Sequence, residues 1–288
     1  MIWLIGNKGM LGSDFEKGIK DSGLQYVASD REVDITDLGV LRDFTKDKSV
    51  EWIINCSAYT AVDKAEDEKE IAFKINADGV LNITKIAKEL NAKLIHISTD
   101  YVFDGESESA LFEDDATGPI GVYGDSKLAG EQNIVNNYDK FFIVRTAWLY
   151  GKNGNNFPYT MIRLFKEREV VKVVSDQFGT PTYTKDLAEL ILAIVKKDSA
   201  SYGIYHFTNE GRTNWHLFAK KIYELSCEAG IVDGDKKLEI VPIKTEEYPT
   251  KAKRPKNSYL SKEKVKKTFG ITISQWEDSL KKFIAEIK

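Results

Sequence analysis

The sequence predicts an α/β protein built on a doubly wound parallel sheet. Short apolar runs, each typical of a strand buried on both faces, alternate with segments of helical periodicity through the first 150 residues. Alternation of this kind favours parallel strands joined by right-handed crossovers, the Rossmann arrangement. The apolar runs lie at residues 2–5, 25–29, 51–56, 93–97 and 141–145.

A glycine-rich turn joins the first strand to the first predicted helix. It reads Gly6-Asn7-Lys8-Gly9-Met10-Leu11-Gly12, a G-x-x-G-x-x-G spacing. Small residues let the backbone approach a pyrophosphate, whose charge is favoured by the amides of a helix N-terminus. An ordinary tight turn has the same pattern, but Asp30 ends the second strand about 20 residues on, where a carboxylate would accept from a ribose. Arg31 could instead meet a 2′-phosphate, so the choice between NAD and NADP stays open.

Small and polar residues follow the next two strands at their carboxyl ends, where ligands bind in open α/β sheets. Ser57 begins such a loop after the third strand, and Ser98 and Thr99 end the fourth. The hydroxyls of Ser98 and Thr99 are candidates for binding a carbonyl oxygen. Cys56 and His96 lie within the two strands, and we interpret both as core residues rather than catalytic ones.

Tyr123 and Lys127 stand four positions apart at the start of the next predicted helix. That spacing puts both side chains on one helix face, a turn apart. A neighbouring ammonium favours a phenolate, so the pair is a candidate acid/base device near neutral pH. Pairs of this kind also arise by chance in a lysine-rich chain, so the prediction depends on the strand ends around it.

Composition excludes several classes of protein. The charged residues, 30% of the chain, carry both signs to a net charge of −4 without a basic block, which argues against nucleic acid as a partner. Lysine-rich stretches such as 262–267 are interpreted as solvated helix faces. The apolar N-terminus meets Gly6 after five residues, so neither a signal peptide nor a membrane span is expected. Cys56 and Cys227 are too few for a disulfide framework or a zinc site, and we expect a cytoplasmic protein.

The regular alternation of predicted strands and helices ends at about residue 150. We predict a dinucleotide-binding domain over 1–150 and a mainly substrate-binding region over 151–288, from which about 183–208 returns to the first domain. Residues 179–182 are predicted to form a turn. The S-x-x-E sequence at 274–277 has the form of a capping box that opens the last helix. Arg254 lies in a rigid polar loop, where its guanidinium could hold a phosphate or simply face solvent.

Together these residues resemble the extended short-chain dehydrogenase/reductases and, within them, the dTDP-4-dehydrorhamnose reductase family. The Tyr-x-x-x-Lys and glycine motifs mark only the superfamily. Two strings are much narrower, S-T-D-Y-V-F-D-G at 98–105 and A-Y-T-A-V-D at 58–63, and the R-P-x-N-S loop at 254–258 supports them. The resemblance covers almost the whole chain.

The resemblance implies reduction of dTDP-4-dehydro-6-deoxy-L-mannose to dTDP-L-rhamnose by hydride transfer from NADPH or NADH. Tyr123 would protonate the C4 oxygen of the sugar, Lys127 would lower the pKa of Tyr123 and hold the nicotinamide ribose, and Thr99 would hydrogen-bond the same oxygen. The implied cofactor-binding residues are Gly6, Gly9, Met10, Leu11, Gly12, Asp30, Asp34, Ile35, Ser57, Ala58, Tyr59, Ser98, Tyr123 and Lys127. The implied substrate-binding residues are Thr99, Asp100, Tyr123, Trp148, Asn156 and Arg254.

The resemblance leaves other properties open. Some members are described as dimers with Mg²⁺ held by glutamates between subunits, but no such cluster is recognised here, so no metal is assigned and either a monomer or a homodimer is expected. The expected partner is a dTDP-sugar, with no nucleic acid and no membrane. The alternatives are another nucleotide-sugar epimerase or dehydratase, and a non-catalytic NAD(P)-binding subunit like the regulatory subunit of methionine adenosyltransferase. Retention of Thr99, Tyr123 and Lys127 weighs against the second.

Overall fold

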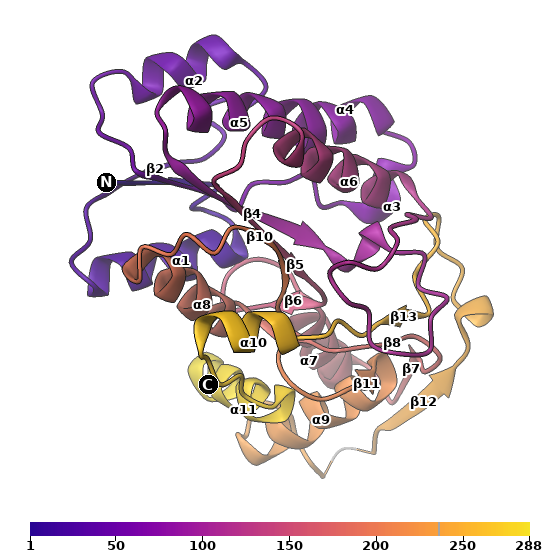
Figure 1. The fold of residues 1–288 in the computed structure, drawn as a ribbon. Helices are drawn as coiled ribbons and strands as arrows, with labels where there is room; N and C mark the ends of the chain where they lie inside the picture. Colours follow the sequence, from indigo (N-terminus) through magenta and orange to yellow (C-terminus); the bar gives the residue numbers. More distant parts are fainter. Residues whose placement is uncertain (236) are drawn as a thin grey trace.

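The computed structural model describes residues 1–235 and 237–288, and its centre is a six-stranded sheet in which every pairing is parallel. The strands are β1 (Ile2–Ile5), β2 (Tyr26–Ser29), β3 (Trp52–Asn55), β4 (Lys93–Thr99), β5 (Phe141–Thr146) and β10 (Gly203–His206). Their order across the sheet is β10-β5-β4-β3-β1-β2 (Figure 1). The predicted doubly wound parallel sheet is therefore confirmed.

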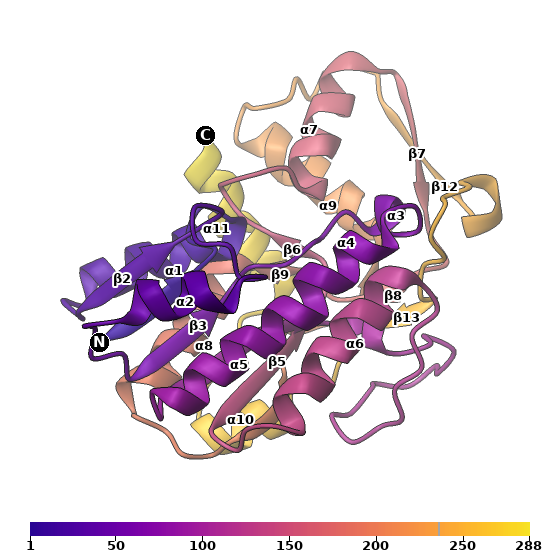
Figure 2. The same cartoon turned by 90° about the horizontal axis from the view of Figure 1, so that it is seen from above.

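Helices cover both faces of this sheet (Figures 1 and 2). One face packs against α1 (Met10–Asp21), α8 (Thr184–Lys196) and α10 (Glu263–Phe269), through side chains such as Phe15 and Ile191. The other packs against α2 (Leu38–Thr45), α5 (Val80–Glu89) and α6 (Val122–Val135), through side chains such as Ile83 and Ile134. With both faces covered, the strands have to be apolar throughout, which is why they are visible in the sequence as continuous hydrophobic runs.

Two further features of the sheet position the site. Because β2 lies on one side of β1 and β3 on the other, the chain changes direction at β1, and a crevice forms outside the carboxyl ends of these strands. The helical segment before β4 is irregular: α3 (Val62–Ala65) is a separate short helix, and α4 (Lys69–Phe73) runs through a π-helical turn, Lys74–Gly79, into α5. Single π-helical turns inside α-helices are frequently found at functional sites.

A second hydrophobic core lies outside the main sheet. It joins α7 (Phe157–Glu167), α9 (Trp215–Glu228) and α11 (Trp276–Ile287) to the parallel pair β7 (Val170–Val174) and β12 (Glu239–Ile243). Short pairings connect it to the rest: β6 (Leu149–Tyr150) with β9 (Thr182–Tyr183), and β8 (Phe178–Gly179) with both β11 (Thr213–Asn214) and β13 (Asn257–Ser258). Two 3₁₀ turns, Asp100–Val102 and Thr245–Glu247, complete the elements.

The second region returns to the main sheet twice. The segment 183–208 supplies α8, which packs on α1, and β10, which pairs with β5. Helix α10 also places Val265 and Phe269 in the first core, a return that the sequence analysis did not predict. The domain boundary at 150 stays a prediction. In the described part of the chain, no helix is long and apolar enough to cross a lipid bilayer.

Two local predictions are wrong. Residues 179–182 form no simple turn, since they connect β8 to β9. The S-x-x-E sequence at 274–277 does not cap α11, which begins at Trp276 with Gln275 as its N-cap and no side-chain cap bond. The amide of Glu210 donates to the Ser274 carbonyl, and the Trp276 amide donates to the Glu210 carbonyl. This backbone pairing holds 274–275 extended and overrides the local capping signal.

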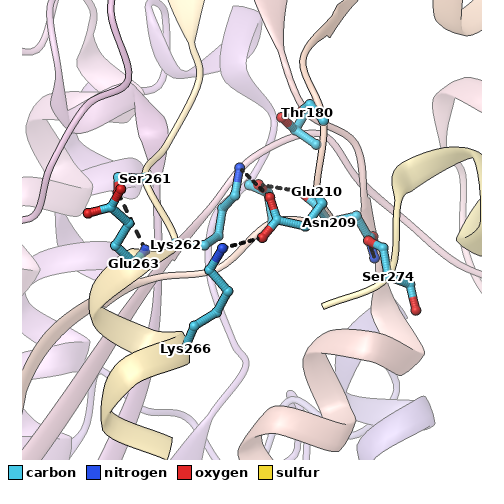
Figure 3. Close-up of polar contacts among 10 residues, drawn as sticks. Thr180, Asn209, Glu210, Ser261, Lys262, Glu263, Lys266 and Ser274 are labelled. Atoms are coloured by element: carbon cyan, nitrogen blue, oxygen red, sulfur yellow. Dashed lines mark hydrogen bonds and ion pairs between the residues drawn. The ribbon is translucent and has the colours of Figure 1, made fainter. Parts of the chain in front are cut away.

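Lys262 contradicts the interpretation of 262–267 as a solvated face. Its side chain is 3% exposed, and its Nζ lies 3.8 Å from Glu210 Oε2 while Lys266 Nζ lies 2.7 Å from Glu210 Oε1 (Figure 3). The Lys262 ammonium also sits over the Tyr259 ring, 4.5 Å from its centroid. Burial lowers the pKa of Lys262 to about 8, although Glu210 opposes the shift. A lysine-rich run does not reveal which of its members tertiary packing will cover.

We expect Lys262→Met to raise the free energy of unfolding at pH 7 by about 1–3 kcal/mol, because it removes a poorly paired buried charge while Lys266 keeps Glu210 paired. The folded-state pKa lies below the unfolded value of 10.5, so the cost of Lys262 is full below about pH 8 and disappears as the pH rises toward 10.5. Urea denaturation at pH 7 and pH 10 measures both effects. Lys267→Met, at an exposed position of the same helix, is the control, and a less stable Lys262→Met protein at pH 7 would contradict the expectation.

Candidate active site

A cavity of about 960 Å³ opens at the carboxyl ends of β1, β3, β4 and β5. This volume is near the upper end for small-molecule sites. Most of the residues predicted from the sequence line it. They are Gly6, Gly9, Met10, Leu11, Asp30, Asp34, Ile35, Ser57, Ala58, Tyr59, Ser98, Thr99, Asp100, Tyr123, Lys127 and Trp148. Three predicted residues, Gly12, Asn156 and Arg254, are not part of its lining.

The glycine-rich turn packs closely against itself and against the loop after β3. Gly6 has a φ of +79°, and a Cβ on it would lie 2.9 Å from the Ser57 nitrogen, so no other residue fits there without strain. A Cβ on Gly12 would lie 2.1 Å from the Gly6 carbonyl oxygen. Gly12 therefore closes the turn by packing and does not face the cavity. Gly9 is the N-cap of α1 and supplies no side-chain cap, which leaves the first amides of the helix available to an anion.

The rim beyond this turn carries groups of both signs. Asp30 and Arg31 line the cavity together, so the geometry does not choose between a ribose hydroxyl and a 2′-phosphate. The Asp30 amide donates to Glu32 Oε1 over 2.7 Å, and this bond is the largest cause of a lowered pKa for Glu32. Asp34 accepts from the Thr36 amide and hydroxyl, which lower its pKa in the same way.

The π-helical turn fixes the loop after β3. Asn76, in this turn, accepts from the Tyr59 amide over 2.8 Å and donates to the Tyr59 carbonyl over 3.0 Å. Its Nδ2 also donates to the Ser126 hydroxyl of α6. Asn76 is 1% exposed, so these bonds form in a dry environment. The wall of the cavity at Tyr59 is thereby tied to the helix that carries Tyr123 and Lys127.

Tyr123 and Thr99 meet at the inner end of the cavity. Thr99 ends β4, and its hydroxyl donates to Asp100 Oδ1 over 2.9 Å and hydrogen-bonds Tyr123. Burial raises the pKa of Tyr123 to about 12; the Thr99 hydrogen bond opposes this shift and Asp100 adds to it. The predicted lowering of this pKa is therefore wrong in sign, because desolvation of the phenol outweighs the favourable contacts. Burial also raises the pKa of Asp100 to about 6, against hydrogen bonds from Ser258 and Thr99.

Lys127 is buried beneath the same part of the cavity, with 2% of its surface exposed. Its Nζ donates to the Ile97 carbonyl over 2.7 Å and lies 3.3 Å from His96 Nε2. Burial lowers the pKa of Lys127 to about 8, with Glu131 and Cys56 opposing the shift. Tyr123 and Lys127 thus line the same cavity, as predicted, but their side chains contact different polar groups.

Three candidates for the substrate pocket lie further out. Trp148 lines the cavity at a positive φ of 48° and stacks on Trp215, with ring centroids 3.8 Å apart. Asn156 is the N-cap of α7: its Oδ1 accepts from the Tyr159 amide and its Nδ2 donates to the Gly151 carbonyl. Arg254 pairs with Asp63 over 2.7 Å. The last two side chains are thus already engaged within the protein.

Comparison with known proteins decides the family. The family model described as RmlD substrate binding domain matches residues 1–288. The chain belongs to this RmlD family. It is 40% identical to the dTDP-4-dehydrorhamnose reductase of Escherichia coli strain K12, with 99% of this chain and 97% of that protein covered.

Solved structures of dTDP-4-dehydrorhamnose reductases support the same family assignment. The crystal structure of a dTDP-4-dehydrorhamnose reductase from Clostridium acetobutylicum is 40% identical and superposes with a TM-score of 0.93, covering 99% of each chain. The reductase from Bacillus anthracis, solved in complex with NADP, is 38% identical with a TM-score of 0.92, covering 99% of this chain and 98% of that one. The resemblance predicted from the sequence is confirmed.

The site of this RmlD-family chain also contains residues that the sequence analysis did not select. Tyr101 and Thr146 line the cavity, and the Tyr101 ring meets the Tyr123 ring edge-on with centroids 5.4 Å apart. Thr146 directly follows the predicted strand 141–145, and Tyr101 comes four residues after the predicted strand 93–97, so the rule that sites form at the carboxyl ends of strands would have selected both.

Three residues with reactive side chains are held in inert forms. Cys56 lines the cavity, but burial raises the pKa of its thiol to about 12. His96 and His206 are buried, and burial lowers the pKa of each; that of His206 falls to about 3. Across residues 1–235 and 237–288, no three His, Cys, Asp or Glu side chains are grouped so that they could hold a metal ion.

Proposed function

We propose that this protein reduces dTDP-4-dehydro-6-deoxy-L-mannose to dTDP-L-rhamnose, with NADPH or NADH as the hydride donor. The observation that carries the proposal is the convergence of Thr99, Tyr123 and Lys127 on one large cavity, in a chain that belongs to the RmlD family. The proposed partner is the dTDP-sugar alone, and the proposed location is the cytoplasm, for a monomer or a homodimer.

The residues around the glycine turn fit a nicotinamide dinucleotide. Gly9 adds no side chain at the start of α1, and the uncapped amides of this helix suit a pyrophosphate. Asp30 and Arg31 stand where the adenosine ribose would lie, with Asp34 and Ile35 beside them. When bound, the nicotinamide supplies a hydride to C4 of the sugar. We assign Ser57, Ala58, Tyr59 and Ser98 to the wall that holds its ribose.

Tyr123 supplies the proton that the C4 oxygen needs once the carbon accepts a hydride. A pKa raised to about 12 keeps the phenol protonated over the whole physiological range, which is the state required of a proton donor. The Thr99 hydroxyl lies beside the phenol, and it hydrogen-bonds the same oxygen of the sugar by turning its proton from Asp100 toward that oxygen. Asp100 and Trp148 line the substrate end of the cavity.

Steady-state assays test this function. Purified protein should oxidise one equivalent of NADPH or NADH for each keto sugar consumed, and a comparison of dTDP- and UDP-linked keto sugars should favour the dTDP substrate. Conversion of the sugar with the coenzyme left unchanged would instead indicate an epimerase or dehydratase. Normal coenzyme binding with no turnover on any sugar would indicate a non-catalytic subunit.

A further inference from the structure

A buried row of polar side chains runs beneath the cavity from β3 across β4 to α6. Asn55 Nδ2 lies 3.0 Å from His96 Nδ1, and Lys127 Nζ lies 3.3 Å from His96 Nε2. None of the three side chains is more than 2% exposed. The sequence analysis treated His96 as a core residue, and nothing in the proposed chemistry uses it or Asn55.

The orientation of the Asn55 amide is fixed by Ser57. The Ser57 amide donates to Asn55 Oδ1 over 3.0 Å, and the Ser57 hydroxyl donates to the same oxygen over 2.6 Å. If the Asn55 amide were reversed, its NH₂ group would face the Ser57 N–H, and both donors would be unsatisfied at a cost of about 1–3 kcal/mol each. The Asn55 NH₂ group therefore faces His96.

This orientation determines the tautomer of His96. Nδ1 faces an N–H donor and must be the acceptor, so in a neutral ring the proton is on Nε2. The ring is neutral because burial lowers the pKa of His96 well below its usual value. Nε2–H then points at Lys127 Nζ. An ammonium has three donors and no acceptor, whereas a neutral amine has a lone pair that can accept.

We propose that Asn55 and His96 are positioning residues that stabilise the neutral amine of Lys127 and so bring the loss of its proton toward neutral pH. The contact of Lys127 with the Ile97 carbonyl suits either form, since both forms donate. The consequence for turnover rests on the proposed function, but the tautomer and the charge of Lys127 do not.

The other ionisable groups around Lys127 do not cancel this effect. Cys56, which follows β3, and Tyr123 of α6 both hold their protons, because burial raises each pKa to about 12. Glu131, one turn along α6, favours the ammonium. Its carboxylate is already bound by Arg145 of β5, through bonds of 2.7 to 3.2 Å, and it accepts from Ser98. The Arg145 guanidinium thus neutralises much of the negative charge on Glu131, which weakens the attraction between Glu131 and the Lys127 ammonium.

The tautomer can be measured directly in the unaltered protein. The chain has three histidines, so ¹⁵N NMR of the rings resolves each, and His96→Gln assigns the His96 signals. We expect His96 to carry its proton on Nε2 with Nδ1 bare. His206 is an internal control with the opposite tautomer, because its Nδ1 lies 3.1 Å from the Leu111 carbonyl and must donate. A His96 ring protonated on Nδ1 would overturn the proposal.

Asn55→Asp tests the link to Lys127. The carboxylate keeps the acceptor for Ser57 and turns His96 Nδ1 into a donor, which leaves Nε2 as an acceptor for an ammonium. We expect the His96 tautomer to switch, the NMR titration midpoint of Lys127 to rise by about one pH unit or more, and the alkaline limb of the kcat profile to move with it. Lys127→Arg assigns the lysine signal.

Either of two results would count against the inference. One is an ordinary midpoint for Lys127 in the unaltered protein. The other is a midpoint raised by Asn55→Asp with an unchanged tautomer, since charge alone would then explain the shift. Both are read without substrate, so a failure of the proposed function would leave these measurements intact.

Discussion

Replacing Tyr123 by Phe should lower kcat by about 10²-fold or more, the usual effect of losing a general acid, and should leave coenzyme affinity nearly unchanged. The reason is local: Tyr123 lies at the inner end of the cavity, and its pKa, raised to about 12, keeps a transferable proton on the phenol at neutral pH. Thr99 hydrogen-bonds this phenol but already donates its own proton to Asp100. Steady-state kinetics and calorimetric binding of NADPH separate the two effects.

Tyr101→Phe is the matched comparison for Tyr123→Phe. It removes a phenolic hydroxyl from the adjacent ring, which packs edge-on against Tyr123, without removing the proposed donor. The loss of kcat should be clearly smaller. If Tyr123→Phe turns over at the rate of the unaltered protein, Tyr123 has no part in proton transfer.

Removing Glu131 should destabilise the fold by about 3–5 kcal/mol, because it leaves the Arg145 guanidinium buried without its counter-charge. The two side chains are 2% and 3% exposed, and Arg145 Nη2 lies 2.7 Å from Glu131 Oε2. The remaining contacts of Arg145 are weaker: a 3.3 Å hydrogen bond to the Glu113 carbonyl and a position 5.0 Å above the Phe103 ring. A loss of this size is a large fraction of the stability of an ordinary domain.

Urea denaturation of Glu131→Gln measures the loss. Glu131→Gln combined with Arg145→Met should recover part of it, since the double variant no longer buries an unpaired guanidinium. The Gln side chain keeps an oxygen that can accept from Ser98, so the loss of stability reports the missing charge. A loss below about 1 kcal/mol in the single variant would mean that water reaches Arg145, contrary to its burial.

The sheet and the cavity could be predicted from the sequence because each is formed by short segments whose residue types are locally constrained. A strand buried on both faces has to be apolar, a turn beneath a phosphate has to be small, and the carboxyl ends of parallel strands have to share one edge. These rules led from the sequence to Gly6, Thr99 and Tyr123. The same rules say nothing about which side chains the second region covers.

The predictions that failed depend on tertiary contacts. The pKa of Tyr123 is raised and not lowered as predicted, because the phenol loses contact with water only when the chain is folded. Lys262 was expected in solvent and is buried against Glu210. The role of Asn156 in binding substrate stays a prediction, and the sequence analysis did not show that its side chain caps α7. His96 was correctly placed in the core, yet its contact with Lys127 required the structure.

Transfer of deuterium from the coenzyme to the sugar tests the central claim most directly. Protein incubated with NADPH or NADH that carries deuterium at both C4 positions, and with dTDP-4-dehydro-6-deoxy-L-mannose, should release dTDP-L-rhamnose with one deuterium at C4 for each coenzyme oxidised. Mass spectrometry and proton NMR of the product locate the label. A sugar product without deuterium, or coenzyme recovered in its reduced form, would contradict the assignment of this cavity to hydride transfer.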